Sequence, residues 1–118
     1  MAEYTLDMEV RTNADWADAL AFVAGDPAAP VNLTGYAFEQ HIRTAPDASY
    51  TVLTCSTANG RLVIGTPASA GNLAWNVPVA VMRSLRPGVY VHDIALTVGG
   101  KTRVFAKGEI TVVEGVTK

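Results

Sequence analysis

The chain has 118 residues and a mass of 12.5 kDa, which is enough for one domain with its own hydrophobic core. Apolar residues make up 49% of the sequence and charged residues 17%, a composition that excludes a disordered chain. The nine Lys and Arg and eleven Asp and Glu residues give a formal net charge of −2, so we do not expect a basic nucleic-acid-binding surface. The longest apolar run is far too short to span a membrane. The first residues, Met1 to Tyr4, also lack the basic segment and apolar run of a secretory signal.

The N-terminal part of the sequence predicts two strands followed by a break. Apolar and polar residues alternate strictly over Tyr4–Arg11, which is typical of a half-buried strand. The face expected to be buried holds Tyr4, Leu6, Met8 and Val10. A second run, Trp16–Val23, also places its large apolar residues in phase, although its alanines would suit a short helix too. The segment Gly25–Pro30 is then expected to break regular structure.

The middle of the sequence predicts a central strand that begins after Gly35 and has one buried face. Its expected inward positions are Tyr36, Phe38, Gln40 and Ile42, and its outward positions are Ala37, Glu39, His41 and Arg43. Turn chemistry follows at Pro46–Ser49, and Asn59-Gly60 is a tight-turn pair. Further strands are predicted over Tyr50–Cys55, Arg61–Ile64 and Gly71–Val77.

The last third predicts a short helix and a long hairpin. Pro78–Leu85 begins with a proline and spaces its apolar residues three and four apart, which indicates a helical crossover between two sheets. Val89–Val98 and Arg103–Val113 are strands joined at Gly99-Gly100. About eight strands at intervals of roughly 8–12 residues predict an antiparallel all-β sandwich, formed as a single domain over residues 1–118.

Leu85, Gly88 and Tyr90 have the spacing of a tyrosine corner. In that motif the hydroxyl of a tyrosine shortly after a turn bonds to upstream backbone at a sandwich crossover. A core tyrosine placed after a turn explains the same spacing. On either interpretation we expect Tyr90 to be buried near Trp75.

No pair of residues in the sequence predicts catalysis. His41 lies on the outward phase of its strand, and His92 lies on the inward phase of another strand, directly before Asp93. Because neighbouring strand residues point to opposite faces, His92 and Asp93 cannot form a catalytic dyad. We expect His92 to be a structural residue, bonded to backbone at the rim of a sheet, and we expect the protein not to be an enzyme.

The sequence also predicts neither a cofactor nor a metal. Cys55 lies in an apolar strand, where a buried and inert thiol is expected, and one cysteine cannot form an internal disulfide. No two His or Cys residues have the spacing of metal ligands, and Asp26 stands alone in its turn. The glycines lie at turns and do not form a phosphate-binding loop.

Three regions are expected to contact a partner. The strand Tyr4–Arg11 offers a sheet edge, and the prolines of Gly25–Pro30 would hold an extended arm at low entropic cost. Lys101, Arg103 and Lys107 are expected on one face of the last hairpin, where they would meet an acidic partner or protect a strand edge from pairing. The expected contact residues are Tyr4, Leu6, Asp26, Pro27, Pro30, Lys101 and Arg103.

Four sequence elements, in a fixed order, carry a resemblance to a known family. They are a Leu-x-Gly segment leading to a strand that ends in Ile-Arg, an Asn-Gly-Arg turn, a crossover with Pro-Gly before Tyr and Asp, and a closing Gly-Glu-Ile-Thr-Val strand. The residues are Leu33–Tyr36, Phe38, Gln40, Ile42, Arg43, Asn59–Arg61, Ile64, Gly71, Leu73, Met82, Leu85, Pro87, Gly88, Tyr90, Asp93, Gly108–Val112, Val116 and Thr117. Over residues 4–117 the chain resembles small phage and prophage virion proteins, similar to the immunoglobulin-like N-terminal module of upper baseplate and tail-fibre-attachment proteins. His92 stands where that family more often has Tyr or Phe.

The resemblance implies an immunoglobulin-like sandwich of about seven to nine strands that acts as a non-enzymatic structural protein of a bacteriophage virion. It would be made in the host bacterial cytoplasm and assembled into the tail, the baseplate or a fibre attachment. A capsid decoration protein of the same fold is the alternative. The implied partners are other virion proteins and further copies of the chain, since virion parts act through symmetric multiplicity.

A carbohydrate-binding module is a further alternative, because sandwiches can bind sugars through exposed aromatic side chains. Trp75 and Tyr36 are expected to face the core. Trp16 and Tyr50 would then have to form the platform.

Overall fold

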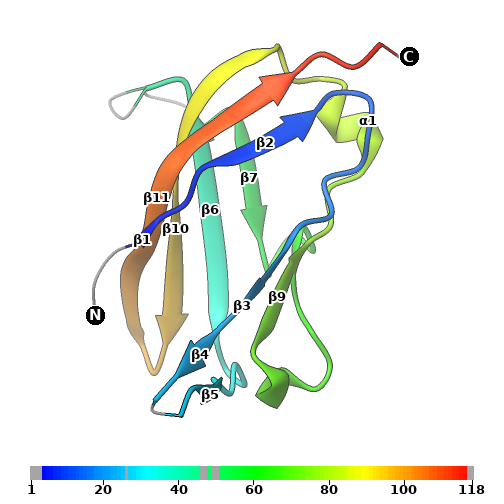
Figure 1. The fold of residues 1–118 in the computed structure, drawn as a ribbon. Coiled ribbons are helices and arrows are strands. Elements are labelled where there is room, and N and C mark those ends of the chain that lie inside the picture. Colours follow the sequence, from blue (N-terminus) through cyan, green and yellow to red (C-terminus); the bar gives the residue numbers. More distant parts are fainter. Residues whose placement is uncertain (1–3, 26, 46–47, 49–50, 117–118) are drawn as a thin grey trace.

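Two β-sheets face each other in the computed structural model, which describes residues 4–25, 27–45, 48 and 51–116 (Figure 1). The larger sheet has the strand order β1-β11-β10-β6-β7, with β2 also paired to β11. Its strands are β1 (Tyr4–Thr5), β2 (Met8–Arg11), β6 (Ala37–Arg43), β7 (Leu53–Ser56), β10 (Gly88–Val98) and β11 (Lys101–Val113). The smaller sheet, in the order β3-β9-β8, contains β3 (Ala19–Ala21), β8 (Leu62–Ile64) and β9 (Asn72–Trp75). The predicted all-β sandwich is confirmed.

The first predicted strand is present but is interrupted between β1 and β2. Both pieces pair with β11 in parallel, whereas the other strand pairs of the described residues are antiparallel. Leu6 and Met8 are half-buried and Val10 is buried, as the alternation predicts. Tyr4 is 61% exposed, because it lies at an open side of the sandwich rather than over its core.

The segment Trp16–Val23 is extended rather than helical. Trp16 forms an isolated bridge with Val77, and the chain then enters β3 and β4 (Val23–Ala24). The alanines lie on an exposed strand face, so tertiary pairing with β9 decides between the two conformations that their propensities allow.

The prediction that Gly25–Pro30 breaks regular structure is wrong for the last two residues of the segment. β5 (Ala29–Pro30) folds back and pairs with β4, Val23 opposite Pro30 and Ala24 opposite Ala29, so this segment is a short hairpin and not an extended arm. Two hydrogen bonds hold the base of the hairpin: Phe22 N–H donates to Gly71 O at 2.7 Å, and Val31 N–H donates to Phe22 O at 2.9 Å.

Both sheets contribute aromatic side chains to the core. Trp16 and Trp75 stack with ring centroids 5.5 Å apart and an interplanar angle of 15°. Phe22, Phe38 and Phe105 form a second cluster, with centroid separations of 5.4–5.9 Å. The predicted alternation of β6 is confirmed, since its Phe, Gln and Ile side chains are buried while Ala37 and Glu39 are exposed.

The tyrosine corner has the hydrogen bond that its spacing predicts. The Tyr90 hydroxyl donates to Arg86 O at 2.6 Å, and the ring is buried beside Leu85 and Trp16. Because Trp16 stacks on Trp75, Tyr90 belongs to the same part of the core. Gly88 begins β10 directly after the turn.

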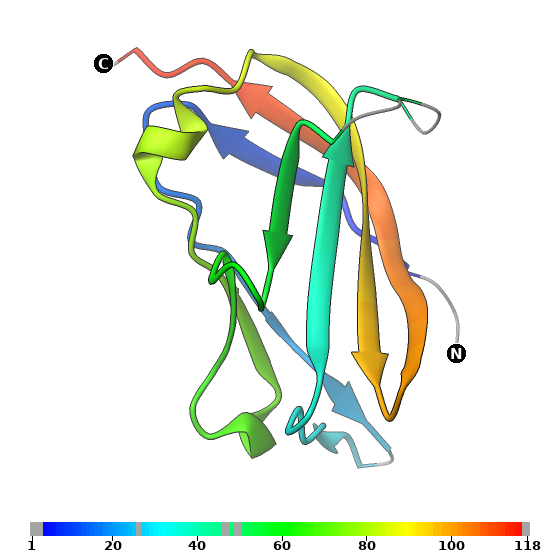
Figure 2. The same ribbon diagram turned by 180° about the vertical axis from the view of Figure 1, so that it is seen from behind.

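The predicted helical crossover is confirmed as α1 (Val79–Met82), which links β9 of the smaller sheet to β10 of the larger sheet (Figure 2). Its first backbone amide, of Val79, donates to Asp15 Oδ1 at 2.6 Å. A 3₁₀ turn at Ala68–Ala70, which the sequence did not predict, precedes β9. Within the described ranges, no helix has the length and hydrophobicity needed to cross a membrane.

Gly71 and Gly60 provide a test of how the small sheet meets the β4–β5 hairpin. Both have left-handed backbone, with φ of +74° and +79°. A Cβ on Gly71 would lie 2.7 Å from Phe22 O and 2.9 Å from Val31 O, whereas a Cβ on Gly60 would meet nothing within 4 Å.

We expect Gly60→Ala to lower the free energy of unfolding by about 1–2 kcal/mol, the cost of left-handed backbone. Gly71→Ala should cost about 1–3 kcal/mol more, because it adds a steric conflict with the hairpin backbone. Urea denaturation of the two variants measures the difference. Equal losses would contradict the close approach of Phe22 and Val31 to Gly71.

Candidate functional site

A chain of hydrogen bonds links Trp75 of the smaller sheet, through Gln40, to His92 of the larger sheet. Its Nε2 lies 2.7 Å from Leu6 O, its Nδ1 lies 2.9 Å from Gln40 Nε2, and Gln40 Oε1 accepts from Trp75 Nε1 at 2.9 Å. A carbonyl can only accept, so the proton of the imidazole is on Nε2, and Nδ1 accepts from the Gln40 amide. Every polar side-chain atom of this chain therefore has a matching partner.

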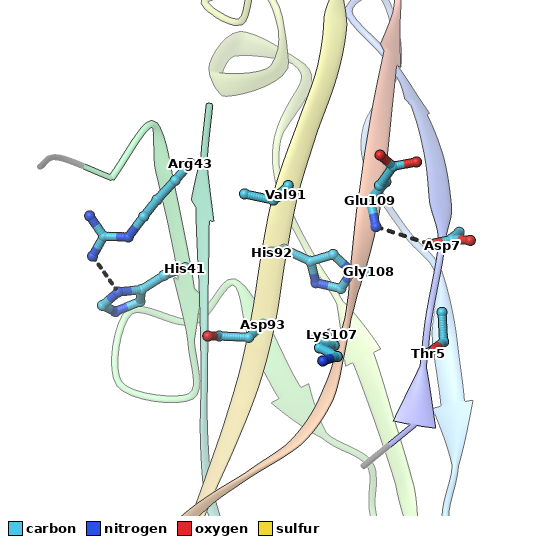
Figure 3. A pocket seen from close by; sticks show the side chains of 10 residues that line it. All are labelled: Thr5, Asp7, His41, Arg43, Val91, His92, Asp93, Lys107, Gly108 and Glu109. Atoms are coloured by element: carbon cyan, nitrogen blue, oxygen red, sulfur yellow. Dashed lines mark hydrogen bonds between the residues drawn. The ribbon is translucent and has the colours of Figure 1, made fainter. Parts of the chain in front are cut away.

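The position of His92 confirms the predicted structural role. Its side chain is 5% exposed and bonds to the backbone of Leu6, next to the edge of the larger sheet. Figure 3 shows the side chains of His92 and Asp93 leaving β10 in opposite directions, as expected of neighbouring strand residues. Burial lowers the pKa of His92 below 6.5, and the bond to Leu6 O and the charges of Asp93 and Asp7 oppose that shift.

Gly108 allows this arrangement, and the sequence reasoning missed it. It lies directly opposite His92 in the β10–β11 pair, and a Cβ there would be 2.2 Å from Leu6 O. Only glycine lets the N-terminal strand approach closely enough for Leu6 O to reach the imidazole. A glycine in the middle of a strand pattern marks such close approaches, so the signal was present in the sequence.

Cys55 is fully buried in β7, as predicted. Burial raises the pKa of its thiol to about 12, and the positive charge of Arg61 opposes the shift only in part. At neutral pH such a thiol is almost entirely protonated, and the thiolate is the form that acts as a nucleophile.

The outer face of the larger sheet carries a depression of about 530 Å³ with charges of both signs (Figure 3). Its lining residues are Thr5, Asp7, His41, Arg43, Val91, His92, Asp93, Lys107, Gly108 and Glu109. The dashed lines in Figure 3 mark Arg43 Nη2 to His41 Nδ1, 3.4 Å, and Glu109 N–H donating to Asp7 Oδ1, 2.9 Å.

The register of the strands keeps Thr5 and His41 of this depression apart. Thr5, Lys107, Asp93 and His41 form one row across β1, β11, β10 and β6. Thr5 and His41 are therefore three strand spacings apart, about 14 Å. A hydroxyl and an imidazole at that distance cannot act as nucleophile and base. In the part of the chain that the structure describes, no group of three or more His, Cys, Asp or Glu is placed to hold a metal ion.

A second cavity, which we call the side groove, opens between β1 and β11 of the larger sheet on one side, and β3 of the smaller sheet with the following strand β4 on the other. Its volume is about 360 Å³, and its lining is mostly apolar. The lining residues are Tyr4, Thr5, Leu6, Leu20, Ala21, Phe22, Val23, Ala24, Val31, Tyr36, Leu96, Arg103, Phe105 and Ala106. Val23, like Tyr4, is about 60% exposed at its rim.

The structure brings several of the predicted contact residues to the side groove. Tyr4, Leu6 and Arg103 line it. Pro27 and Pro30 belong to the adjacent β4–β5 hairpin, both with exposed side chains. Asp26 lies outside the described residues.

The predicted basic stripe of Lys101, Arg103 and Lys107 is wrong in one member. Arg103 lies opposite the buried Leu96, whereas Lys107 lies opposite the exposed Asp93, so the two point to opposite faces of the sheet. A β-bulge in β11 causes this, because the register shifts by one residue at Phe105. Lys101, two residues before Arg103, keeps the same phase as Arg103.

The aromatic platform required for carbohydrate binding lacks its first member. Trp16 is 3% exposed and stacked inside the core on Trp75. Tyr36 is half-buried against Phe38, and Tyr50 lies outside the described residues.

Comparison with known proteins gives no family. No protein-family model matches the chain, and no curated protein matches it. Among solved structures it is similar to CopC from Methylosinus trichosporium OB3b, with 15% sequence identity and a TM-score of 0.45, over 100% of this chain and 90% of that chain. A similarity of this degree supports no statement about ligand or partner.

We expect Cys55 to be unreactive in the native protein. With a pKa of about 12, about one thiol in 10⁴ is ionised at pH 8. Labelling with iodoacetamide at pH 8 should proceed only after urea is added. The double variant Cys55→Ala with Ala58→Cys moves the thiol to an exposed turn and should label at once without urea. Rapid labelling of the native wild-type protein would contradict the burial of Cys55.

We expect the protein to lose stability as the pH falls below about 6.5. The unfolded chain protonates His92 near 6.5, while the native chain resists protonation because the pKa is lowered, so acid favours unfolding. The contribution of His92 to the free energy of unfolding is fully present above pH 6.5. It declines by at most about 1.4 kcal/mol per pH unit as the pH falls toward the pKa of His92 in the native chain. Urea denaturation between pH 8 and pH 5.5 measures this decline.

Two variants isolate the contribution of His92 to that decline. His92→Leu should abolish it, and should also destabilise the protein at pH 8 because Gln40 and Leu6 lose a partner. His41→Gln removes the outward imidazole and keeps His92, so the decline caused by His92 should remain. A decline of the same size in His92→Leu would show that other groups cause it.

Proposed function

We propose that the chain is a non-enzymatic structural protein of a bacteriophage virion, a component of the tail, the baseplate or a fibre attachment. The sequence elements that resemble phage and prophage virion proteins support the virion role. In the structure these elements form the central strand β6, the tyrosine corner and the closing strand β11.

The side groove is the observation that supports protein–protein contact as the mode of action. It is an exposed, largely apolar cavity at the place where the edges of both sheets come together. Exposed apolar patches of this kind are typical of protein-binding surfaces, and free strand edges add main-chain hydrogen bonds to such contacts. Tyr4 and Val23 already contribute large apolar side chains to its rim.

The environments of His92, Cys55 and His41 favour a role in protein–protein contact rather than in catalysis. Both ring nitrogens of His92 form hydrogen bonds, with Gln40 and with Leu6 O, and Cys55 is buried with a raised pKa. His41 shares hydrogen bonds with Glu39 and Arg43, its neighbours on the same strand face. Each of these groups has a structural partner or an environment that opposes reaction.

Purified particles provide the test. Phage particles from a strain that carries the gene should contain the chain in a fixed ratio to the major tail protein, as measured by quantitative mass spectrometry with an abundant host protein as the contamination control. After heads and tails are separated, we expect the chain in the tail fraction. Recovery with the heads alone would favour the capsid decoration alternative, and absence from both fractions would refute a virion role.

A further inference from the structure

We propose that the side groove binds an extended, apolar β-strand of a partner protein, and that this strand carries a carboxylate beside Arg103. The proposal rests on the proposed function for the kind of partner, another virion protein. It adds the mode of binding, in which the partner strand pairs with a free sheet edge. Three features of the groove support it.

The first feature is the free edge of β3. Trp75 N–H donates to Asp18 O, and Phe22 N–H donates to Gly71 O, so the residues of this segment that bond to β9 are alternate ones. In an antiparallel pair the intervening residues direct their N–H and C=O groups to the other side. Ala19 and Ala21 therefore present main-chain donors and acceptors away from β9, and Ala21 lines the groove.

The second feature is the opposite wall, which is also a sheet edge. Leu6 N–H donates to Lys107 O, and β1 pairs with β11 in parallel. Thr5, one residue earlier, therefore directs its main-chain groups away from β11. Thr5 lines the groove as well, so residues from two strand edges line it.

The third feature is the composition of the groove. Leu20, Phe22 and Phe105 give it an apolar floor, and Arg103 is the charged residue among its described lining. Lys101 has the same phase as Arg103 on β11, so positive charge gathers on that side. An apolar strand with a carboxylate next to Arg103 complements both properties.

A fatty acid also combines an apolar chain with a carboxylate, but the strand edges favour a peptide. An aliphatic chain in the groove would cover the main-chain groups of Ala21 and Thr5 without bonding to them. Buried main-chain groups without partners are costly, whereas a peptide strand supplies a donor and an acceptor at every second residue.

Synthetic peptides test the proposal. The probes are Ac-Asp-Val-Thr-Val-Thr-Val-Gly-NH₂ and Ac-Gly-Val-Thr-Val-Thr-Val-Asp-NH₂, titrated into the 118-residue chain by calorimetry and by amide NMR. At least one should bind saturably and shift the amides of Ala21 and Thr5. Two analogues of the peptide that binds are then compared, one with its Thr residues N-methylated and one with its Val residues N-methylated. Each modification blocks one of the two hydrogen-bonding edges of the peptide strand. At least one of the analogues should bind about tenfold more weakly than the unmodified peptide.

Variants of the protein locate the binding. Ala21→Pro removes one N–H that faces the groove and leaves the ladder to β9 intact, so it should weaken binding about tenfold, while Ala21→Thr keeps that N–H and should weaken binding less than Ala21→Pro does. Arg103→Glu should weaken binding of the Asp peptide and favour the matching Lys peptide. If Ala21→Pro does not fold, Arg103→Glu and the N-methylated peptides still decide the question.

Other outcomes overturn the proposal. These are the absence of binding by both probes, equal binding of the N-methylated analogues, displacement of the peptide by decanoate at lower concentration, and sedimentation of the wild-type protein as a dimer that Ala21→Pro dissociates. The last outcome would assign the groove to a second copy of the chain.

The test is independent of the particle experiment. If the chain is present in particles but binds neither probe, the groove proposal fails and the virion role stands. If the probes bind and the chain is absent from particles, the groove proposal stands and the virion role fails.

Discussion

A chain of hydrogen bonds crosses the core from the Trp75 indole of the smaller sheet, through Gln40 and His92 of the larger sheet, to the main-chain carbonyl of Leu6. Buried polar groups are costly without partners, so each member is tolerated only because the next one is in place. The segments that carry them are far apart in the sequence. A shift of one residue in any of these strands would turn a side chain to the other face and break the chain, so these bonds specify the register of the sandwich.

The same bonds fix the N-terminal strand, and with it one wall of the side groove. Leu6 O reaches the imidazole because Gly108 has no side chain, and Leu6 N–H bonds to β11 at the same point. β1 is thus held as an edge strand beside an apolar opening rather than folded over it. The opposite wall, β3, is held by its pairing with β9 and by the bridge from Trp16 to Val77. The groove is therefore a consequence of how the two sheets are tied together.

The β-bulge at Phe105 decides what kind of surface the last hairpin presents. It brings Phe105 and Ala106 inward together and separates Arg103 from Lys107. One basic side chain then belongs to the groove, and the other belongs to the mixed-charge outer face. A surface that the alternation predicts as a continuous basic stripe becomes two surfaces of different character. The apolar one, in which Arg103 is the charged residue among the described lining, is the surface where we propose that a partner strand binds.

Local patterns in the sequence determined the sandwich, the phase of β6, the helical crossover at Val79–Met82 and the long hairpin, because period-two alternation, proline and glycine act within a few residues. The spacing before Tyr90 likewise anticipated its bond to Arg86 O. The parallel pairing of the N-terminal strand, the bulge at Phe105 and the meeting of two strand edges at the side groove arose only in the tertiary structure. Each of these depends on contacts between segments distant in the chain, such as the approach of Leu6 to Gly108, and alternation along one strand carries no information about its neighbours.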